Sequence, residues 1–295
     1  MARFGQVLTA MVSPFTAGDQ LDVDGAQELA KWLVANGNDG LVIAGTTGES
    51  PTLTHDEQIE LIRAVVDAVD VPVIAGTGSN DTRAAVELTR RATEVGATGI
   101  LSVTPYYNRP SQEGLVRHFE AVAAATDLPV MLYDIPVRTG RKIETENLVR
   151  LSRVDNIVAL KDAAGNPAET AVVIAEAGPD FDVYSGDDSF TLPLLAVGAV
   201  GVVGVATHWC GVETKLMVQA HTAGNVAEAT KINQGLLASW SYETGDLAPN
   251  PLPSKAMLRV LGLPGGACRP PMGPEPEWLA DEARKVLSNL GRPGF

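Results

Sequence analysis

The sequence predicts an α/β protein, a (β/α)8 TIM barrel followed by a small, all-helical C-terminal extension. Short apolar segments rich in β-branched residues alternate with segments of helical periodicity up to about residue 224, which makes eight strand–helix units. Similar helix-to-strand turns recur at residues 37–40, 96–99 and 198–201. Two βα units of about 30 residues fit between Gly40 and Gly99. An open, doubly wound sheet is the alternative architecture.

Each expected strand is a short apolar run bounded by turn residues. The strands are expected at residues 6–12, 40–44, 71–75, 99–104, 129–134, 157–162, 181–185 and 201–206. The helices after them are expected at residues 24–35, 54–69, 81–95, 111–125, 144–152, from 166 onward, 189–197 and 211–222. Two helices have clear start signals, a capping box at residues 54–57 and an Asn-Pro pair at 166–167.

The pattern changes after residue 224, where helices are expected at residues 225–242, 253–261 and 275–290 with proline-rich turns between them. We therefore divide the chain into a barrel at residues 1–224, which carries the active site, and a helical extension at residues 225–295. The extension is expected to pack on the barrel or on a neighbouring subunit. The uncharged run at residues 189–212 is long enough for a membrane span, but its prolines and glycines favour a buried helix, turn and strand.

The chain of 295 residues has a net charge of −14, which argues against nucleic acid and anionic membranes as partners. An anionic substrate must then be attracted by a local positive group. The two cysteines, Cys210 and Cys268, form no CxxC pair, and the first residues show no signal-peptide pattern. We therefore expect a cytoplasmic protein.

Lys161 is the strongest candidate for a catalytic residue. It follows the apolar run 157–160, and strand alternation places its side chain on the same face as Ile157 and Ala159. If that face is a dry interior, burial favours the neutral amine, a nucleophile that can form a Schiff base with a carbonyl substrate. The alternative is an ordinary solvated lysine at the end of a strand.

Function in a barrel lies at the C-terminal ends of the strands, so the loops that follow them contain the other candidates. The loop at residues 45–50 offers hydroxyls and close backbone N–H groups that can cradle a carboxylate, or it is a flexible loop that binds nothing. The loop at 104–110 holds two tyrosines between prolines, which could equally form a subunit contact. Tyr133 could transfer protons and Arg138 could bind a carboxylate, unless they are a core tyrosine and a surface arginine.

Two other patterns are weaker candidates for binding sites. The Gly-x-Gly at residues 76–78 lacks the third glycine of a dinucleotide fingerprint and is rejected. Asp187 and Asp188 are interpreted as loop or N-cap acids, with a metal site as the lesser alternative, because the four histidines show no ligand spacing.

Four motifs together resemble the dihydrodipicolinate synthase family, which belongs with N-acetylneuraminate lyase to the pyruvate-dependent aldolase superfamily. They are Gly-Thr-Thr-Gly-Glu-Ser at 45–50, Thr-Pro-Tyr-Tyr-Asn-Arg-Pro at 104–110, Tyr-Asp-Ile-Pro-Val-Arg-Thr-Gly at 133–140 and Ala-Leu-Lys-Asp at 159–162. The resemblance covers nearly the whole chain and includes residues 250–255.

The resemblance implies a role for each matching residue. Lys161 would form the Schiff base with pyruvate, and Tyr133, Thr46 and Tyr107 would form a proton relay, with Tyr107 reaching into a neighbouring subunit's site. The positions expected to bind substrate are Thr47, Arg138, Gly186 and, through its backbone carbonyl, Val203. No metal and no organic cofactor is implied.

The implied reaction is condensation of pyruvate with L-aspartate 4-semialdehyde to give 4-hydroxy-tetrahydrodipicolinate, in lysine and diaminopimelate biosynthesis, by a homo-oligomer expected to be a dimer of dimers. The arginine after Ile-Pro-x and the Thr-Thr pair favour this reading. One alternative is cleavage of N-acetylneuraminate or a 2-keto-3-deoxy sugar acid through the same imine. A non-catalytic barrel kept as a binding or scaffold protein is another.

Two departures from the family pattern affect these expectations. Asp134 stands where many members have Asn, which would add negative charge near the site. In the cleft where some members bind lysine, Ser50, His55, Asn80 and Tyr106 match, whereas Gln58 and Ala84 replace a His and a Glu.

We therefore predict weak or absent feedback by lysine, because the carboxylate that would pair with the ammonium of the effector is missing. A steady-state assay with added lysine measures this. Strong inhibition at submillimolar lysine would contradict the prediction.

Overall fold

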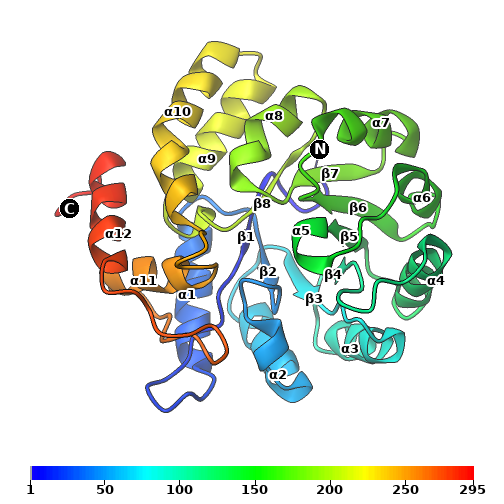
Figure 1. Cartoon of the computed structure of the whole chain (residues 1–295), viewed down its shortest axis with the longest axis horizontal. Coiled ribbons are helices and arrows are strands. Elements are labelled where there is room, and N and C mark those ends of the chain that lie inside the picture. The colour runs from blue at the N-terminus through cyan, green and yellow to red at the C-terminus, as the bar shows by residue number, and fades with distance from the viewer. Residues whose placement is uncertain (1) are drawn as a thin grey trace.

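The computed structural model describes residues 2–295 and shows a closed barrel of eight parallel strands in chain order, which confirms the predicted fold class (Figure 1). All eight strands are largely buried, as expected for parallel strands covered by helices. They are β1 (Val7–Ala10), β2 (Gly40–Ile43), β3 (Val73–Gly76), β4 (Gly99–Val103), β5 (Val130–Asp134), β6 (Ile157–Asp162), β7 (Asp182–Ser185) and β8 (Gly201–Gly204).

Helices surround the barrel and lie close to their predicted positions. They are α1 (Val23–Ala35), α2 (His55–Val66), α3 (Thr82–Glu94), α4 (Gln112–Ala123), α5 (Pro136–Thr139), α6 (Thr145–Leu151), α7 (Pro167–Ala177), α8 (Thr191–Ala196) and α9 (Thr207–Thr222), with short 3-10 turns η1 (Ser50–Thr52) and η2 (Asp188–Phe190). The predicted capping box is present, with Thr54 and Glu57 each bonded to the other's backbone. The prediction missed α5, and it placed the start of α9 too late because that helix begins at Thr207 and is kinked at Cys210.

Strand register fixes the neighbours of Lys161. In the parallel ladders Lys161 pairs with Tyr133 of β5 on one side and with Tyr184 of β7 on the other. Side chains at the same register point to the same face of a sheet. The barrel interior therefore holds the lysine between two tyrosines, above a core that includes Leu8, Ile74 and Met131.

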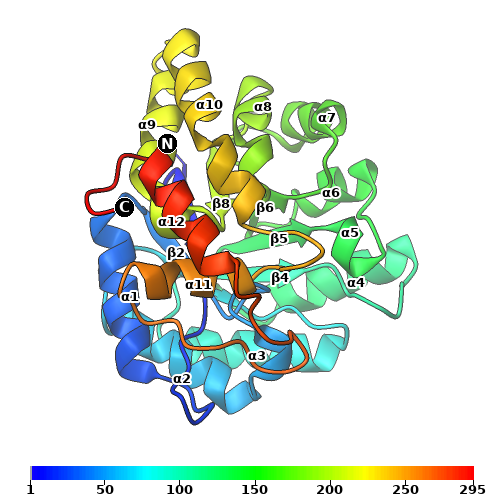
Figure 2. The same cartoon turned by 60° about the vertical axis from the view of Figure 1, so that its left-hand side comes forward.

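The extension consists of α10 (Val226–Tyr242), α11 (Leu252–Val260) and α12 (Leu279–Asn289), which build a hydrophobic cluster together with residues of α9 (Figure 2). Polar contacts also attach it to the barrel. Lys255 forms an ion pair with Glu49 at 2.6 Å, with both side chains almost fully buried. Asn250 donates a hydrogen bond to Thr47 at 2.9 Å. The extension therefore packs on the barrel of its own chain.

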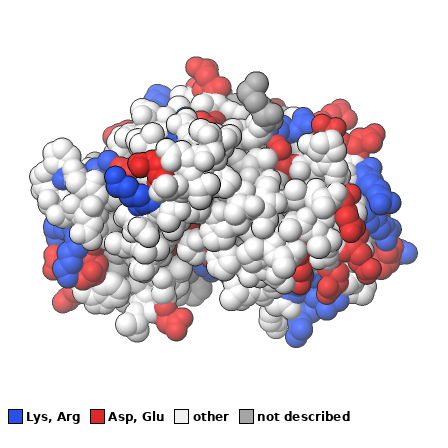
Figure 3. All heavy atoms as spheres, turned by 90° about the horizontal axis from the view of Figure 1, so that it is seen from above, with Lys and Arg blue, Asp and Glu red and all other residues white. Residues whose placement is uncertain are grey.

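No helix in residues 2–295 is long and apolar enough to cross a membrane, and the uncharged run at 189–212 forms η2, α8, β8 and the start of α9, close to the predicted helix, turn and strand. On the face seen in Figure 3, charged side chains gather toward the two ends and the middle is largely uncharged. That face therefore offers no continuous basic patch of the kind that binds nucleic acid.

The barrel closes between β1 and β8 at a point where only glycine fits. A Cβ added to Gly201 would lie 1.9 Å from the backbone oxygen of Gln6, and backbone cannot move aside as a flexible side chain can. Gly235 in α10 is the opposite case, because a Cβ there meets no atom within 4 Å.

We predict that Gly201→Ala lowers the free energy of unfolding by about 3 kcal/mol, because the added methyl overlaps the neighbouring strand. Gly235→Ala should raise it by about 0.5–1 kcal/mol, because alanine restricts the unfolded chain and favours helix. Urea denaturation of both variants measures the difference. Equal stabilities for the two variants would contradict this account of barrel closure.

Candidate active site

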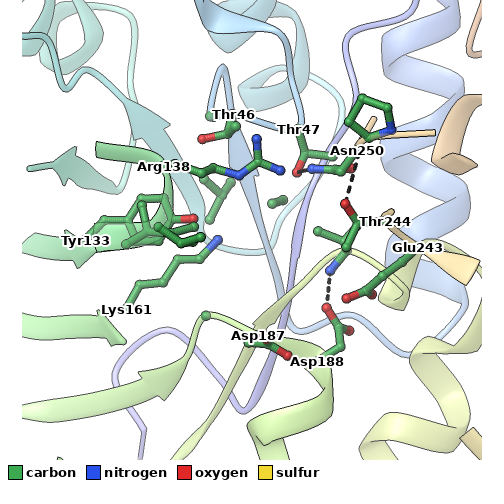
Figure 4. A pocket seen from close by; sticks show the side chains of 18 of the residues that line it. Thr46, Thr47, Tyr133, Arg138, Lys161, Asp187, Asp188, Glu243, Thr244 and Asn250 are labelled. Atoms are coloured by element: carbon green, nitrogen blue, oxygen red, sulfur yellow. Dashed lines mark hydrogen bonds between the residues drawn. The ribbon is translucent and has the colours of Figure 1, made fainter. Parts of the chain in front are cut away.

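A cavity of about 550 Å³ opens at the C-terminal ends of the barrel strands (Figure 4). Its walls come from the barrel and also from the segment that joins α10 to α11. The predicted residues that line it are Thr46, Thr47, Tyr133, Arg138, Lys161 and Gly186. Six residues from five separate loops or strands, predicted from sequence alone, thus converge on one cavity.

Lys161 is 4% exposed, and its amine points into this cavity (Figure 4). Its Nζ lies 4.4 Å from the ring centroid of Tyr133. Burial lowers the pKa of the Lys161 amine to about 8, with Arg138 lowering it further and the Asp188 carboxylate opposing the shift. About a tenth of the amine is therefore neutral and nucleophilic at pH 7, far more than in a lysine at its ordinary pKa.

Tyr133 is 5% exposed, and its phenol lines the same cavity as the hydroxyl of Thr46. Burial raises the pKa of the Tyr133 phenol well above its usual value. The phenol is therefore protonated at neutral pH and can donate a proton or pass one on through Thr46. Tyr133 lies in β5 and Thr46 follows β2, so the C-terminal end of the barrel brings together two residues from strands that are not neighbours.

Thr47, Arg138 and Gly186 form the remaining predicted part of the cavity. Thr47 is 3% exposed, and its hydroxyl accepts a hydrogen bond from Asn250 of the extension. Arg138 lies in the short helix α5 and provides a positive charge in a protein of net charge −14. A Cβ on Gly186 would lie 2.9 Å from Lys161 Cγ, so the glycine makes room for the lysine side chain.

Tyr107 and Val203 lie outside this cavity. Tyr107 is 90% exposed, has a left-handed backbone with φ of 72°, and donates its N–H to Thr139. Its phenol is therefore available for contact with another molecule. Val203 is fully buried within β8, and Val205, two residues further on, lines the cavity instead.

The four residues of the expected effector cleft are spread over three loops beside the site. Ser50 lines a small cavity that also touches Thr46 and Tyr133. Asn80 accepts a hydrogen bond from Asn108, whereas His55 is exposed at the start of α2 and Tyr106 is half-buried. Gln58 is buried and donates to the backbone of Ser50.

Sequence reasoning missed the contribution of the extension. Glu243, Thr244 and Asn250 line the cavity, and the only early signal was the match at residues 250–255 (Figure 4). Because a predicted domain boundary at residue 224 gave no reason to look beyond it, these residues were not singled out.

The two acidic residues after β7 differ from one another. Asp187 accepts a hydrogen bond from the backbone of Ser189, as expected of a cap. Asp188 is 2% exposed and accepts from the backbone of Val205 instead. Across residues 2–295, no group of three or more His, Cys, Asp or Glu side chains is arranged as metal ligands would be.

Asp134 lies on the opposite face of β5 from Tyr133, so its charge does not enter the cavity as its sequence position suggested. Its Oδ1 accepts hydrogen bonds from the backbone of Ile143 and from Thr104, and it pairs in register with Asp162 of β6. Burial, with the neighbouring Asp162 charge, raises the pKa of the Asp134 carboxyl to about 7. Asp134 therefore anchors the β5–α6 connection.

The closed barrel and the buried amine at its C-terminal end define a (β/α)8-barrel enzyme. Residues 3–290 match the model of the dihydrodipicolinate synthetase family. The chain belongs to that family.

The sequences of related proteins match this chain over nearly their full lengths. A 4-hydroxy-tetrahydrodipicolinate synthase from Moorella thermoacetica is 50% identical over 99% of both chains, and one from Acidothermus cellulolyticus is 51% identical over 100% of this chain and 94% of its own. Among solved structures, a dihydrodipicolinate synthase from Bacillus anthracis superimposes with a TM-score of 0.94 at 46% identity, covering 98% of this chain and 99% of the other. One from Cyanidioschyzon merolae, solved with lysine bound, gives 0.95 at 43% identity with the same coverage.

We predict that Asp134→Asn removes a pH-dependent loss of stability. Because the pKa in the folded state exceeds that of the unfolded state, the folded protein binds the extra proton, and stability falls as pH rises from about 4 to about 7. Between pH 4 and pH 8 the stability of the variant relative to the wild type should therefore rise by about 4 kcal/mol.

Urea denaturation of both proteins from pH 4 to pH 8 measures this. The difference in unfolding free energy should grow with pH and level off near pH 7. A constant difference across this range would show that Asp134 does not carry the proton.

Proposed function

We propose that this enzyme condenses pyruvate with L-aspartate 4-semialdehyde to give 4-hydroxy-tetrahydrodipicolinate, as in the biosynthesis of diaminopimelate and lysine. The observation that carries the proposal is the buried Lys161 amine in contact with Tyr133, in a cavity that also holds Thr46, Thr47 and Arg138. The names of the relatives, at about half identity over the whole chain, support the choice of substrates.

Lys161 attacks the ketone carbon of pyruvate in its neutral form, and loss of water gives an imine. The protonated imine nitrogen withdraws electrons, so a methyl proton leaves and an enamine forms. The enamine carbon attacks the aldehyde carbon of aspartate semialdehyde, whose oxygen takes up a proton. The amine of that substrate then attacks the imine carbon, closes the ring and releases Lys161.

The cavity residues have distinct roles in this sequence. Tyr133 and Thr46, whose hydroxyls both line the cavity, pass protons to and from the reacting atoms. Thr47 and the backbone near Gly186 receive the pyruvate carboxylate. Arg138 receives the carboxylate of the second substrate, since it is a fixed cation at the cavity wall.

The proposal extends to the assembly and the cellular setting. The exposed Tyr107 contacts a second subunit and completes the proton relay there, and two such dimers pair as a tetramer. The backbone carbonyl of Val203 faces the substrate side of β8. The reaction needs no metal and no organic cofactor, because the lysine itself provides the electron sink, and the enzyme works in the cytoplasm.

We predict that pyruvate with borohydride leaves a stable adduct on Lys161, because borohydride reduces the imine to a secondary amine. Trapping should increase with pH through a midpoint of about 8, as the amine loses its proton. Peptide mass spectrometry locates the adduct. Lys161→Ala should abolish both the adduct and the coupled condensation of pyruvate with aspartate semialdehyde.

Two outcomes would contradict the proposed function. An unmodified wild-type chain would reject the imine. If pyruvate is trapped on Lys161 but is not condensed with aspartate semialdehyde, and the enzyme instead cleaves a sugar acid, then aspartate semialdehyde is rejected as the second substrate and the imine is kept.

A further inference from the structure

Two acidic side chains are buried in the wall of the cavity beside Lys161 and are not used in the reaction sequence above. Asp188 lies in η2, after β7, and Glu243 ends α10 in the extension, so the pair joins the barrel to the extension (Figure 4). Asp188 is 2% exposed and Glu243 is 8% exposed. A buried carboxylate is costly unless it is compensated, so the pair calls for an explanation.

Backbone N–H groups of the loop after β8 hold both side chains in place. The N–H of Val205 donates to Asp188 Oδ2 at 2.7 Å, and the N–H of Ala206 donates to Glu243 Oε2 at 3.1 Å. A Cβ on Gly204 would lie 2.5 Å from Asp188 Oδ1, so a glycine makes room for that oxygen. The loop therefore forms a binding site for the two carboxyl groups, with one backbone donor for each and space left by the glycine.

The two carboxyl groups also lie beside one another in the cavity wall (Figure 4). Two carboxylates contain only acceptors, so a hydrogen bond between them requires a proton. Asp188 Oδ1 is buried and finds no N–H or hydroxyl donor among residues 2–295, so a proton on the adjacent Glu243 is the donor that would satisfy it. Burial, followed by the nearby Asp188 charge, raises the pKa of Glu243 well above its usual range, which agrees with a protonated Glu243.

The charge on Asp188 and Glu243 acts on the amine of Lys161. Asp188 and Glu243 favour its protonated form, Arg138 opposes it, and Asp187 contributes less than either carboxyl of the pair. Tyr133 also faces the amine, and Cys210 lies behind Asp188, but both are neutral because burial raises their pKa values. A charged imine between Arg138 and apolar walls needs a counter-charge.

We propose that Asp188 and Glu243 share one proton and together carry a single negative charge, which stabilises the protonated imine on Lys161. Two charges would hold the free amine protonated and inert, whereas none would leave the buried imine cation uncompensated. Both residues act through Lys161 and are therefore positioning residues. This inference rests on the proposed function, because it assigns a role to the pair in the same imine step.

A set of isosteric variants tests the inference. In Glu243→Gln, the amide still donates to the Asp188 carboxylate, and one charge remains. In Asp188→Asn, the amide donates to Glu243, which then becomes the carboxylate, and one charge again remains. The double variant removes the charge. Asp187→Asn is the matched control, because it removes a full charge from the same loop outside the pair.

The readout is the pH midpoint for trapping of pyruvate on Lys161 by borohydride. Each single variant of the pair should keep the wild-type midpoint within about 0.3 units, whereas the double variant should lower it by about one unit. The pyruvate concentration for half-maximal trapping should rise about tenfold in the double variant only. Asp187→Asn should shift the midpoint less than the double variant.

Several outcomes would overturn the inference. A midpoint lowered by either single variant as much as by the double variant would mean two separate charges. An unchanged midpoint in a folded double variant, as judged by circular dichroism, would mean that the pair does not act on Lys161. If the double variant does not fold, Asp188→Ser combined with Glu243→Gln removes the charge in its place, and the same two outcomes apply; a shifted midpoint in either single variant of the pair rejects the shared proton by itself.

Failure of the proposed function gives a different result. If pyruvate is not trapped on the wild type, the imine is rejected, and the pair is then tested through the pH dependence of Lys161 acylation by acetic anhydride. The same pattern of midpoints among the variants is expected there, since acylation also requires the neutral amine.

Discussion

This site depends on one constraint, which is that solvent water is kept away from the amine of Lys161. A lysine in solution is protonated at neutral pH and cannot attack a ketone. The barrel interior lowers the pKa of Lys161 to about 8 by burying it between two strands whose tyrosines face it. The closed ladder of eight strands is needed for this, because an open edge would let water reach the amine.

The surrounding charges adjust the pKa of Lys161 that burial has lowered. Arg138 disfavours the lysine cation, and the acidic pair on the other wall favours it. The balance leaves an amine that can be neutral before it reacts and an imine that can be charged afterwards. The same cavity therefore serves two charge states in succession, which a simple apolar pocket could not do.

Much of this could be predicted from sequence because it depends on local patterns. Strand alternation placed Lys161 on the face of Ile157 and Ala159, and the glycine-rich loop after the second strand marked Thr46 and Thr47, whereas Gly186 came from the family resemblance alone. Other features depend on contacts between distant segments. Asp188 is buried beside Glu243, which lies 55 positions later in the chain, and a local sequence pattern cannot predict such a contact. The outward direction of Asp134 was available from alternation, since Tyr133 faces inward, but its hydrogen bonds to Ile143 and Thr104 were not.

The hydrogen bond from Asn250 to Thr47 has a consequence for biosynthesis of the chain itself. The catalytic lysine and its tyrosine emerge from the ribosome well before residue 243, and one wall of their cavity is absent until α10 and the following segment have been made and have docked. During that interval solvent reaches the amine and favours its inert, protonated form. The neutral, nucleophilic amine therefore depends on a segment that is made only after the whole barrel.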